Sequence, residues 1–221
     1  MTSHGTGPGS IADDGSAVEF YAALPLDHRN AALIHDALPA GATILELGAG
    51  AGRVTRPLLD LGHPVVAVDD SAEMLARIEG ARTVCSRIED LDLGERFDAV
   101  LLMSYLVNYG SRTGLLAACS RHVQPSGAVI VQREAQGFQA EAGPRTWSHD
   151  GVGYRMYDVS RPGPGILTAT IEYRIGPRLW THTFTSYELP DEDLPEVLAA
   201  AGLRLDRYLD EARSWFLARP V

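Results

Sequence analysis

The chain has 221 residues, of which 45% are hydrophobic, and a formal net charge of −10. The 19 Lys+Arg residues are all arginine, because the sequence contains no lysine, so Schiff-base chemistry and a Tyr–Lys reductase pair are excluded. The acidic balance and the lack of an arginine stripe disfavour a nucleic acid as the main partner.

The first residues are typical of a tail. The stretch MTSHGTGPGS is rich in glycine and serine and lacks the apolar core of a signal peptide. We therefore predict a flexible tail over residues 1–16 and a cytoplasmic protein. No apolar run approaches the ~20 residues of a membrane span, so no membrane partner is expected. Cys85 and Cys119 are interpreted as reduced thiols, and we expect no metal site.

From residue 17 the pattern alternates between helices and strands. Helices are predicted at 17–23 and 28–38, and Asp27 can cap the second. Asp70 with Glu73 three residues later resembles a capping pair for a later helix. Strands separated by helices predict a parallel sheet covered on both faces. The predicted strands are 43–47, 64–69, 82–85, 97–103 and 127–133, with further helices up to Leu61 and at 112–123.

A different pattern begins near Gly151. Residues 166–175 alternate strictly, and we expect their odd-numbered side chains to face a core. Turn signals flank this run, so Gly151–Ser160, 166–175 and Arg178–Tyr187 predict a three-stranded antiparallel insertion. A helix at 191–201 and strands at 203–209 and 213–219 complete a single domain that begins at residue 17.

The most informative stretch is 43–75. An apolar run ends in the glycine-rich turn Gly48–Gly52, and a second apolar run ends in Asp69. This pattern predicts a βαβ unit with an acidic residue where a ribose would lie. A dinucleotide site has its third small residue at position 53, which is Arg53 here. Glu46 before the loop favours a ligand with a positive charge nearby, and Asp69 could accept from both ribose hydroxyls.

Three sequence motifs together indicate one protein family more specifically than the glycine loop alone. ILELGAGAGRVT, VVAVDDSAEML and FDAVLLMSYLVNY, in this order and spacing, resemble the class I S-adenosylmethionine-dependent methyltransferases of the small-molecule type. The resemblance implies an α/β fold with a Rossmann-like, doubly wound, seven-stranded, mostly parallel sheet and a terminal antiparallel hairpin. It also implies S-adenosyl-L-methionine as the cofactor and a substrate-covering role for the insertion, residues 134–188.

The resemblance assigns the cofactor contacts. Gly48 to Gly50 would line the methionine and ribose portions, Glu46 would face the amino group or sulfonium, and Asp69 would bind the ribose diol. Asp70 has the alternative of a helix cap. Since Arg87 stands where many members have Asp, the adenine contact is expected from the Ile88 N–H or from Glu89. The expected cofactor-binding residues are Tyr21, Glu46, Gly48, Ala49, Gly50, Asp69, Asp70, Met74, Ile88, Glu89, Met103 and Ser104.

The candidate residues for catalysis and substrate binding are chosen by their position in the sequence. His149 and His182, near or within the insertion, are candidate general bases, with a surface or structural histidine as the alternative. His122 is interpreted as a helix-terminal residue. Aromatic side chains of the insertion suit a flat small molecule, with a core of the insertion as the alternative. The expected substrate contacts are Tyr105, Asn108, Trp147, Arg155, Tyr173 and Trp180.

These observations predict an enzyme that methylates a nitrogen or oxygen of a small metabolite, as a monomer or homodimer. An NPPY-type tetrapeptide is replaced by MSYL, which argues against methylation of nucleic-acid amino groups. The arginine-only basic set and the Ala/Gly/Pro richness suggest a high-GC bacterial gene and natural-product biosynthesis. The alternatives are a cofactor-binding enzyme of the same fold that catalyses a cyclisation or rearrangement, a nicotinamide-dependent oxidoreductase, and a non-catalytic binding module.

Overall fold

The computed structural model describes residues 3–221. The chain divides into two compact units. Unit 1 combines the residues up to Pro25 with Gly137–Glu188, and unit 2 combines Leu26–Gln136 with Leu189–Val221. Most of the predicted insertion therefore lies in unit 1, together with the N-terminal residues.

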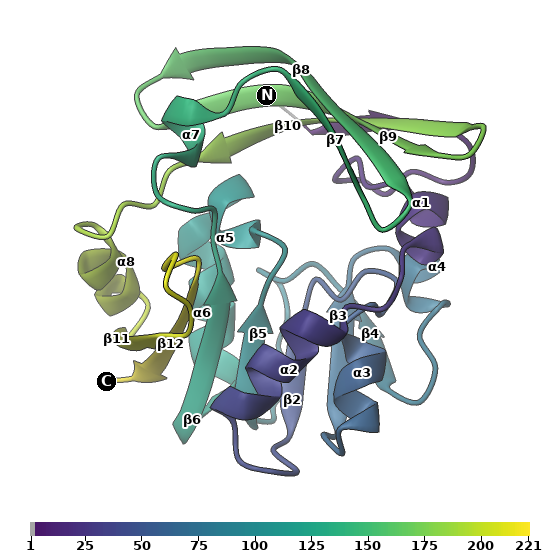
Figure 1. Ribbon diagram of the computed structural model, residues 1–221. Helices are drawn as coiled ribbons and strands as arrows, with labels where there is room; N and C mark the ends of the chain where they lie inside the picture. The colour runs from purple at the N-terminus through teal and green to yellow at the C-terminus, as the bar shows by residue number, and fades with distance from the viewer. Residues whose placement is uncertain (1–2) are drawn as a thin grey trace. The chain divides into compact units, whose positions relative to one another are not determined.

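Unit 2 is built on a twisted sheet (Figure 1). Its strand order is β11–β12–β6–β5–β2–β3–β4, counting only the described residues. Strands β2 to β6 run parallel, whereas β12 is antiparallel to both of its neighbours. The doubly wound, mostly parallel sheet with a terminal hairpin is thus confirmed. The strands are β2 (Ile44–Leu47), β3 (Val65–Asp69), β4 (Arg82–Cys85), β5 (Phe97–Leu102), β6 (Val123–Gln132), β11 (Leu203–Tyr208) and β12 (Trp215–Pro220).

Helices cover both faces of this sheet. On one face, Ala31 and Ile34 of α2 and Leu58 of α3 pack in one core cluster with the sheet. On the other, α6 and α8 contribute to a second cluster. Burial on both sides explains why the parallel strands read as continuous apolar runs. The helices are α2 (His28–Ala37), α3 (Thr55–Asp60), α4 (Ala72–Leu75), α5 (Leu106–Tyr109), α6 (Arg112–His122) and α8 (Leu194–Ala200).

Two helix starts test the capping predictions. Asp27 caps α2 as expected, since its side chain accepts a hydrogen bond from the Asn30 amide at 3.0 Å. The predicted Asp70–Glu73 capping pair is wrong. Ser71 is the N-cap of α4, and its hydroxyl accepts from the Met74 amide at 3.2 Å. No helix within residues 3–221 is long and apolar enough to cross a membrane.

Unit 1 contains an antiparallel sheet in the order β1–β10–β9–β8–β7. Its three central strands match the predicted insertion, but the prediction of only three strands is wrong, because β1 and β7 add an edge on each side within the described residues. The elements are β1 (His4–Thr6), α1 (Val18–Ala23), α7 (Phe138–Glu141), β7 (Arg145–His149), β8 (Val152–Gly163), β9 (Ile166–Ile175) and β10 (Arg178–Tyr187).

The predicted flexible tail is also wrong where the structure describes it. Residues 4–6 pair with β10, with His4 opposite Thr183 and Thr6 opposite Thr181. The Thr6 and Thr181 hydroxyls hydrogen-bond at 2.7 Å. Sheet pairing outweighs the low strand propensity of this glycine-rich stretch. Residues 1–2, also part of the predicted tail, lie outside the described residues.

The core of unit 1 gathers around Phe20 of α1 and Trp180 of β10, with Ala17 and Val152. Leu167 and Ala169 are fully buried, and Tyr173 and Ile175 pack against that core. The expected inward face of β9, formed by its odd-numbered residues, is confirmed at these positions.

Candidate functional site

The site in unit 2 forms where three neighbouring parallel strands end. Strand β2 lies between β3 and β5, so the chain leaves β2 in one direction to form β3 and returns on its other side as β5 (Figure 1). Ligands of open α/β sheets bind at such a switch point, beyond the carboxyl ends of the strands. The structure brings the loops after these three strands together, as the sequence predicted.

The loop after β2 needs its glycines. Gly48, Gly50 and Gly52 have φ values of 72°, 55° and 81°, a conformation that side chains with a Cβ rarely adopt. A Cβ on Gly48 would also lie 2.5 Å from a methyl carbon of Leu106, whereas nothing lies within 4 Å of a Cβ on Gly50. The Gly48 and Ala49 amides both donate to the Val68 carbonyl at 2.9 Å. The loop is therefore held against β3, with open space beside Gly50.

Asp69 fixes the geometry between this loop and the next helix. Its Oδ2 accepts from the Gly50 amide at 2.8 Å, and its Oδ1 accepts from the Ser71 amide at 3.0 Å. The carboxylate thus links the ends of β2 and β3. This arrangement fits the ribose-binding role that the resemblance implies.

Glu46 lies on β2, just before the loop, and its side chain is buried at 1% exposure. Its Oε2 accepts a hydrogen bond from the Thr55 hydroxyl at 2.6 Å. The pKa of Glu46 is raised to about 7. Burial is the largest cause, the Thr55 hydrogen bond acts in the opposite direction, and the charge of Asp69 adds a smaller rise. A cationic group bound nearby would favour the ionised carboxylate. Thr55 was not predicted, because only the structure shows that it orients Glu46.

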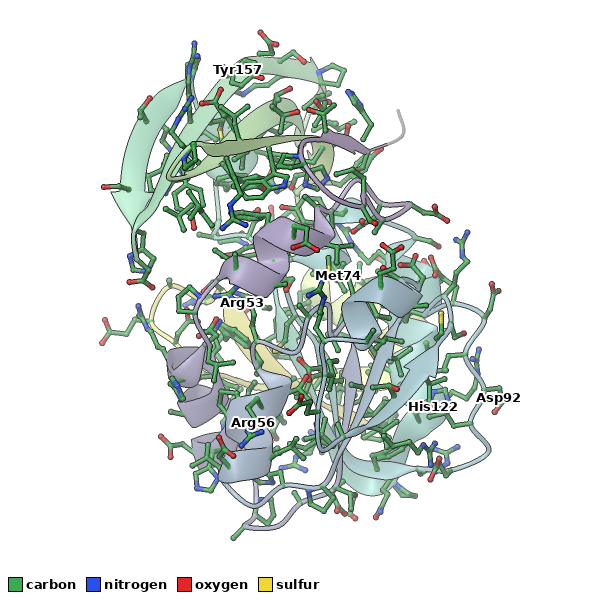
Figure 2. All side chains as sticks on the ribbon, turned by 90° about the vertical axis from the view of Figure 1, so that its right-hand side faces the viewer. Arg53, Arg56, Met74, Asp92, His122 and Tyr157 are labelled. Carbon is green, nitrogen blue, oxygen red and sulfur yellow. The ribbon has the colours of Figure 1, made fainter. Side chains whose placement is uncertain are left out.

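The segment that the resemblance assigns to the adenine edge follows β4. Ile88 packs against the core, and the Glu89 carboxylate lies 3.8 Å from the Arg87 guanidinium. Met74 and Met103 are both buried, at 3% and 5% exposure, and belong to the hydrophobic core. Figure 2 labels Met74. A contact of either residue with a ligand stays a prediction.

The backbone is strained directly after β5. Ser104 and Tyr105 have φ values of 53° and 60°, which is rare for residues with a side chain and is concentrated at functional sites. The Ser104 amide donates to Gln132 Oε1 at 2.9 Å. Burial raises the pKa of the Tyr105 hydroxyl to about 12, with smaller contributions from the charges of Glu134 and Asp27. Tyr105 therefore stays protonated at neutral pH, as a hydrogen-bond donor.

Asn108, a predicted substrate contact, belongs to α5. It is buried at 1% exposure, and its Oδ1 accepts from the Glu134 amide at 2.8 Å. This buried amide joins α5 to the residues after β6, and a contact of Asn108 with the substrate stays a prediction. The Tyr109 hydroxyl donates to Glu134 Oε1 at 3.2 Å, so α5 holds both the backbone and the carboxylate of Glu134. Glu134 is a functional candidate that the sequence did not reveal.

In unit 1 the pairing register aligns four aromatic residues across four strands. Trp147 lies opposite Tyr154, Tyr154 opposite Tyr173, and Tyr173 opposite Trp180. Trp147 and Tyr154 stack at 5.1 Å between ring centroids, and Tyr173 stacks on Phe20 at 4.2 Å. Opposite residues share a face of a sheet, so this aromatic row lies on one face.

Two further predicted substrate residues have other partners in this sheet, and their contact with a substrate stays a prediction. Trp180 is fully buried, and its indole N–H donates to the Pro8 carbonyl at 2.9 Å, so it is a core residue of unit 1. Arg155 lies opposite Glu172, one position away from the aromatic row, and therefore on the other face of the sheet. It packs over the ring of Tyr157, which Figure 2 labels, at 5.1 Å.

Tyr21, which was expected to close over the cofactor, lies at the aromatic row of unit 1. Its ring contacts Phe20 at 5.2 Å, and it shares a hydrogen bond with Tyr173. Burial, followed by the neighbouring Tyr21, holds the pKa of Tyr173 well above the usual value of a tyrosine. Contacts of Tyr21 with a cofactor, and of Trp147 and Tyr173 with a substrate, stay predictions.

The two candidate bases are not brought together. His149 is the last residue of β7, its side chain is 76% exposed, and its Nε2 lies 3.2 Å from the carboxylate of Asp150. His182 lies on β10, with its Nε2 3.2 Å from the Asp14 carbonyl, and burial lowers the pKa of its imidazole. Residues 3–221 contain no group of three or more His, Cys, Asp and Glu placed to hold a metal ion.

Comparisons with known proteins agree with the site in unit 2. Residues 45–131 match the family model described as a methyltransferase domain. A ubiquinone biosynthesis O-methyltransferase of Bradyrhizobium sp. (strain ORS 278) is 33% identical over 100 residues, which are 42% of this chain and 40% of that protein. The match thus spans less than half the length of this curated relative.

Solved structures resemble nearly the whole chain. An S-adenosylmethionine-dependent methyltransferase from Clostridium acetobutylicum has a TM-score of 0.73 at 18% identity, covering 91% of this chain and 94% of that one. The sugar N-methyltransferase KedS8 from Streptoalloteichus sp. has a TM-score of 0.73 at 19% identity, covering 96% and 98%. At this identity the likeness shows the fold.

Proposed function

We propose that this chain, whose residues 45–131 match the model of a methyltransferase domain, transfers a methyl group from S-adenosyl-L-methionine to a small metabolite. The observation that carries the proposal is the carboxylate of Asp69, held by the Gly50 and Ser71 amides at the end of β3. A fixed carboxylate beside a glycine loop suits a ribose diol, and the buried Glu46 suits a positive charge nearby.

The cofactor would supply an activated methyl group on a sulfonium, so the protein's task is alignment and exclusion of water. The loop Gly48–Gly50 would hold the methionine and ribose portions, because its backbone is open to close approach. Ser104 and Tyr105, in their strained conformation, would border the reacting methyl group from the end of β5.

The acceptor is a nitrogen or an oxygen. Glu134 supports this choice, since α5 holds its carboxylate at the end of β6, where it can take the proton that an amine or hydroxyl loses. We place Glu134 ahead of His149 and His182 as the candidate base. The similarity to a ubiquinone O-methyltransferase and to a sugar N-methyltransferase supports both acceptor types.

The insertion, residues 134–188, would select the substrate through its aromatic face. Trp147 and Tyr154 offer stacked rings to a flat or hydrophobic molecule. The arginine-only basic set and the Ala/Gly/Pro richness, which suggest a high-GC bacterial gene, favour a role in natural-product biosynthesis.

Calorimetric titration with S-adenosylhomocysteine tests the cofactor. We expect saturable binding to the full chain, no binding of NADH, and a loss of at least tenfold in affinity in Asp69→Ala, from the loss of charge-assisted hydrogen bonds. Asp36→Ala, which removes an exposed carboxylate of α2, is the matched control and should bind normally. Equal binding of NADH, or no binding of S-adenosylhomocysteine, would contradict the proposal.

Product mass then separates methyl transfer from other chemistry. Incubation with S-adenosylmethionine and a panel of amines, phenols and amino sugars should give products heavier by one methyl group. A rearranged product of unchanged mass would favour the cyclisation or rearrangement alternative.

A further inference from the structure

The last residue of α6, His122, is buried at 1% exposure rather than lying on a helix surface. Its Nδ1 lies 2.8 Å from the Ala118 carbonyl, and its Nε2 lies 3.1 Å from the Leu93 amide nitrogen. A carbonyl can only accept and an amide N–H can only donate, so Nδ1 carries the hydrogen and Nε2 does not. Both contacts together require the neutral imidazole.

The partner of His122 belongs to the segment between β4 and β5, residues 86–96. Arg121 donates to the Leu91 carbonyl of the same segment, so two successive side chains of α6 hold it. Leu91 is buried, and its amide donates to the Ile88 carbonyl at 3.2 Å. The end of α6 therefore contacts the segment that contains Ile88, two hydrogen bonds away from the Ile88 carbonyl. Figure 2 labels His122 and Asp92, which precedes the contacted amide.

This segment also reaches the glycine loop. A Cβ on Gly48 would lie 3.9 Å from the terminal methyl of Ile88, and Ile88 packs against the same core as Leu91. Displacement of the segment would therefore change the wall beside the loop that holds the cofactor.

We propose that neutral His122 is a positioning residue for the adenosine end of the cofactor, and that its protonation releases the segment and weakens binding. A hydrogen on Nε2 would face the Leu93 N–H, so the two donors would repel and the bond would be lost. The inference rests on the proposed function, because it assigns the segment to the adenine edge.

Charged groups near this contact come from both elements. On α6, Arg121 donates to the segment, and Cys119 is neutral because burial raises its thiol pKa to about 12. From the segment, Arg96 donates to the Val123 carbonyl at 2.7 Å, and the Asp92 carboxylate accepts from the Gly94 amide at 3.1 Å.

The binding experiment uses 5′-methylthioadenosine, which lacks the amino acid portion and so does not probe Glu46. Affinity of the full chain should fall roughly tenfold between pH 7.5 and pH 5.5, as one buried hydrogen bond is lost. His122→Gln keeps an acceptor near the Nε2 position but does not titrate, so its affinity should change less than twofold. His28→Gln, at an exposed histidine of α2, should behave like the wild type. The same pH dependence in His122→Gln and the wild type would overturn the proposal.

Hydrogen exchange tests the release without any ligand. After correction for the intrinsic pH dependence, amides of residues 86–94 should lose protection at pH 5.5 in the wild type and keep it in His122→Gln. Unchanged protection in the wild type would sink the inference, even if S-adenosylhomocysteine binds. Loss of protection without any adenosine binding would instead contradict the proposed function alone.

Discussion

At the scale of single residues, Glu46 couples stability to pH. Its pKa is raised by burial from 4.5 to about 7, so the folded chain binds a proton that the unfolded chain releases between these values. Stability contributed by this group is therefore present below about pH 4.5 and is lost as the pH rises through about 7. Ionisation of Glu46 opposes folding at neutral pH and becomes favourable once a cation binds beside it.

Replacement of Glu46 by glutamine should remove the unfavourable ionisation of this buried side chain. Glutamine keeps an acceptor for the Thr55 hydroxyl but stays neutral, so we expect Glu46→Gln to raise the free energy of unfolding at pH 8 by about 2–3 kcal/mol. At pH 4.5 the two proteins should be equally stable, which is the internal control. Urea unfolding at both pH values measures the difference, and an equal effect at both would contradict the assignment.

At the scale of elements, Asp191 holds the terminal hairpin to the rest of unit 2. Its carboxylate accepts from the buried guanidinium of Arg133, from Arg213 at 2.7 Å and from the Tyr208 hydroxyl at 3.0 Å. Burial opposes the charged form, but the hydrogen bonds from Arg133, Arg213 and Tyr208 outweigh it and lower the pKa of Asp191 to about 2. Arg133 also donates to the Leu189 carbonyl at 2.7 Å.

Loss of this carboxylate should destabilise the fold. Asp191→Asn leaves the buried Arg133 without a counter-charge, and we expect a loss of about 3 kcal/mol at pH 7. In the wild type this stability should decline as the pH falls from about 4 toward 2, because the folded-state pKa is the lower one. Glu192→Gln, at the exposed neighbouring position, should change stability by less than about 0.5 kcal/mol. Chemical unfolding of the two variants would show equal stabilities if the network contributes nothing.

The parallel strands could be predicted from the sequence, whereas the edge strands of unit 1 could not. Strands β2, β3 and β5 are buried on both faces and therefore read as apolar runs. Strand β7 is mostly exposed, and β1 has three residues, so neither carries an alternating pattern. Their positions depend on pairing with partners that the local sequence does not specify.

The candidate site likewise contains residues that the sequence revealed and residues that it did not. The Gly48–Gly50 loop and Asp69 belong to one continuous βαβ unit, so local spacing was sufficient to find them. Glu134 and the buried contacts of His122 were missed because the partners lie far away in the chain, 26 residues away for Asn108 and 29 for Leu93. Only the fold brings these groups into contact.

At the scale of the whole molecule, the N-terminal strand completes unit 1. The rings of Trp180 and the backbone of Gly7 and Pro8 are in close contact, and Pro8 accepts the indole N–H. Removal of residues 1–8 should expose Trp180, shift tryptophan emission to longer wavelength and lower the melting temperature of unit 1. The same truncation in Trp180→Phe should give no such shift, which assigns the signal. An unchanged spectrum after truncation would mean that β1 does not cover the indole.

The interleaved chain path also constrains how the protein is made. Strand β12, from residues 215–220, lies between β6 and β11, and β1 pairs with β10 across more than 170 residues. Neither sheet can therefore reach its final pairing while the ribosome still holds the last strands of that sheet. The nascent chain must keep an open edge on β6 until residues 215–220 have left the ribosome, so we expect this protein to depend on protection from chaperones during translation more than a protein with sequential units would.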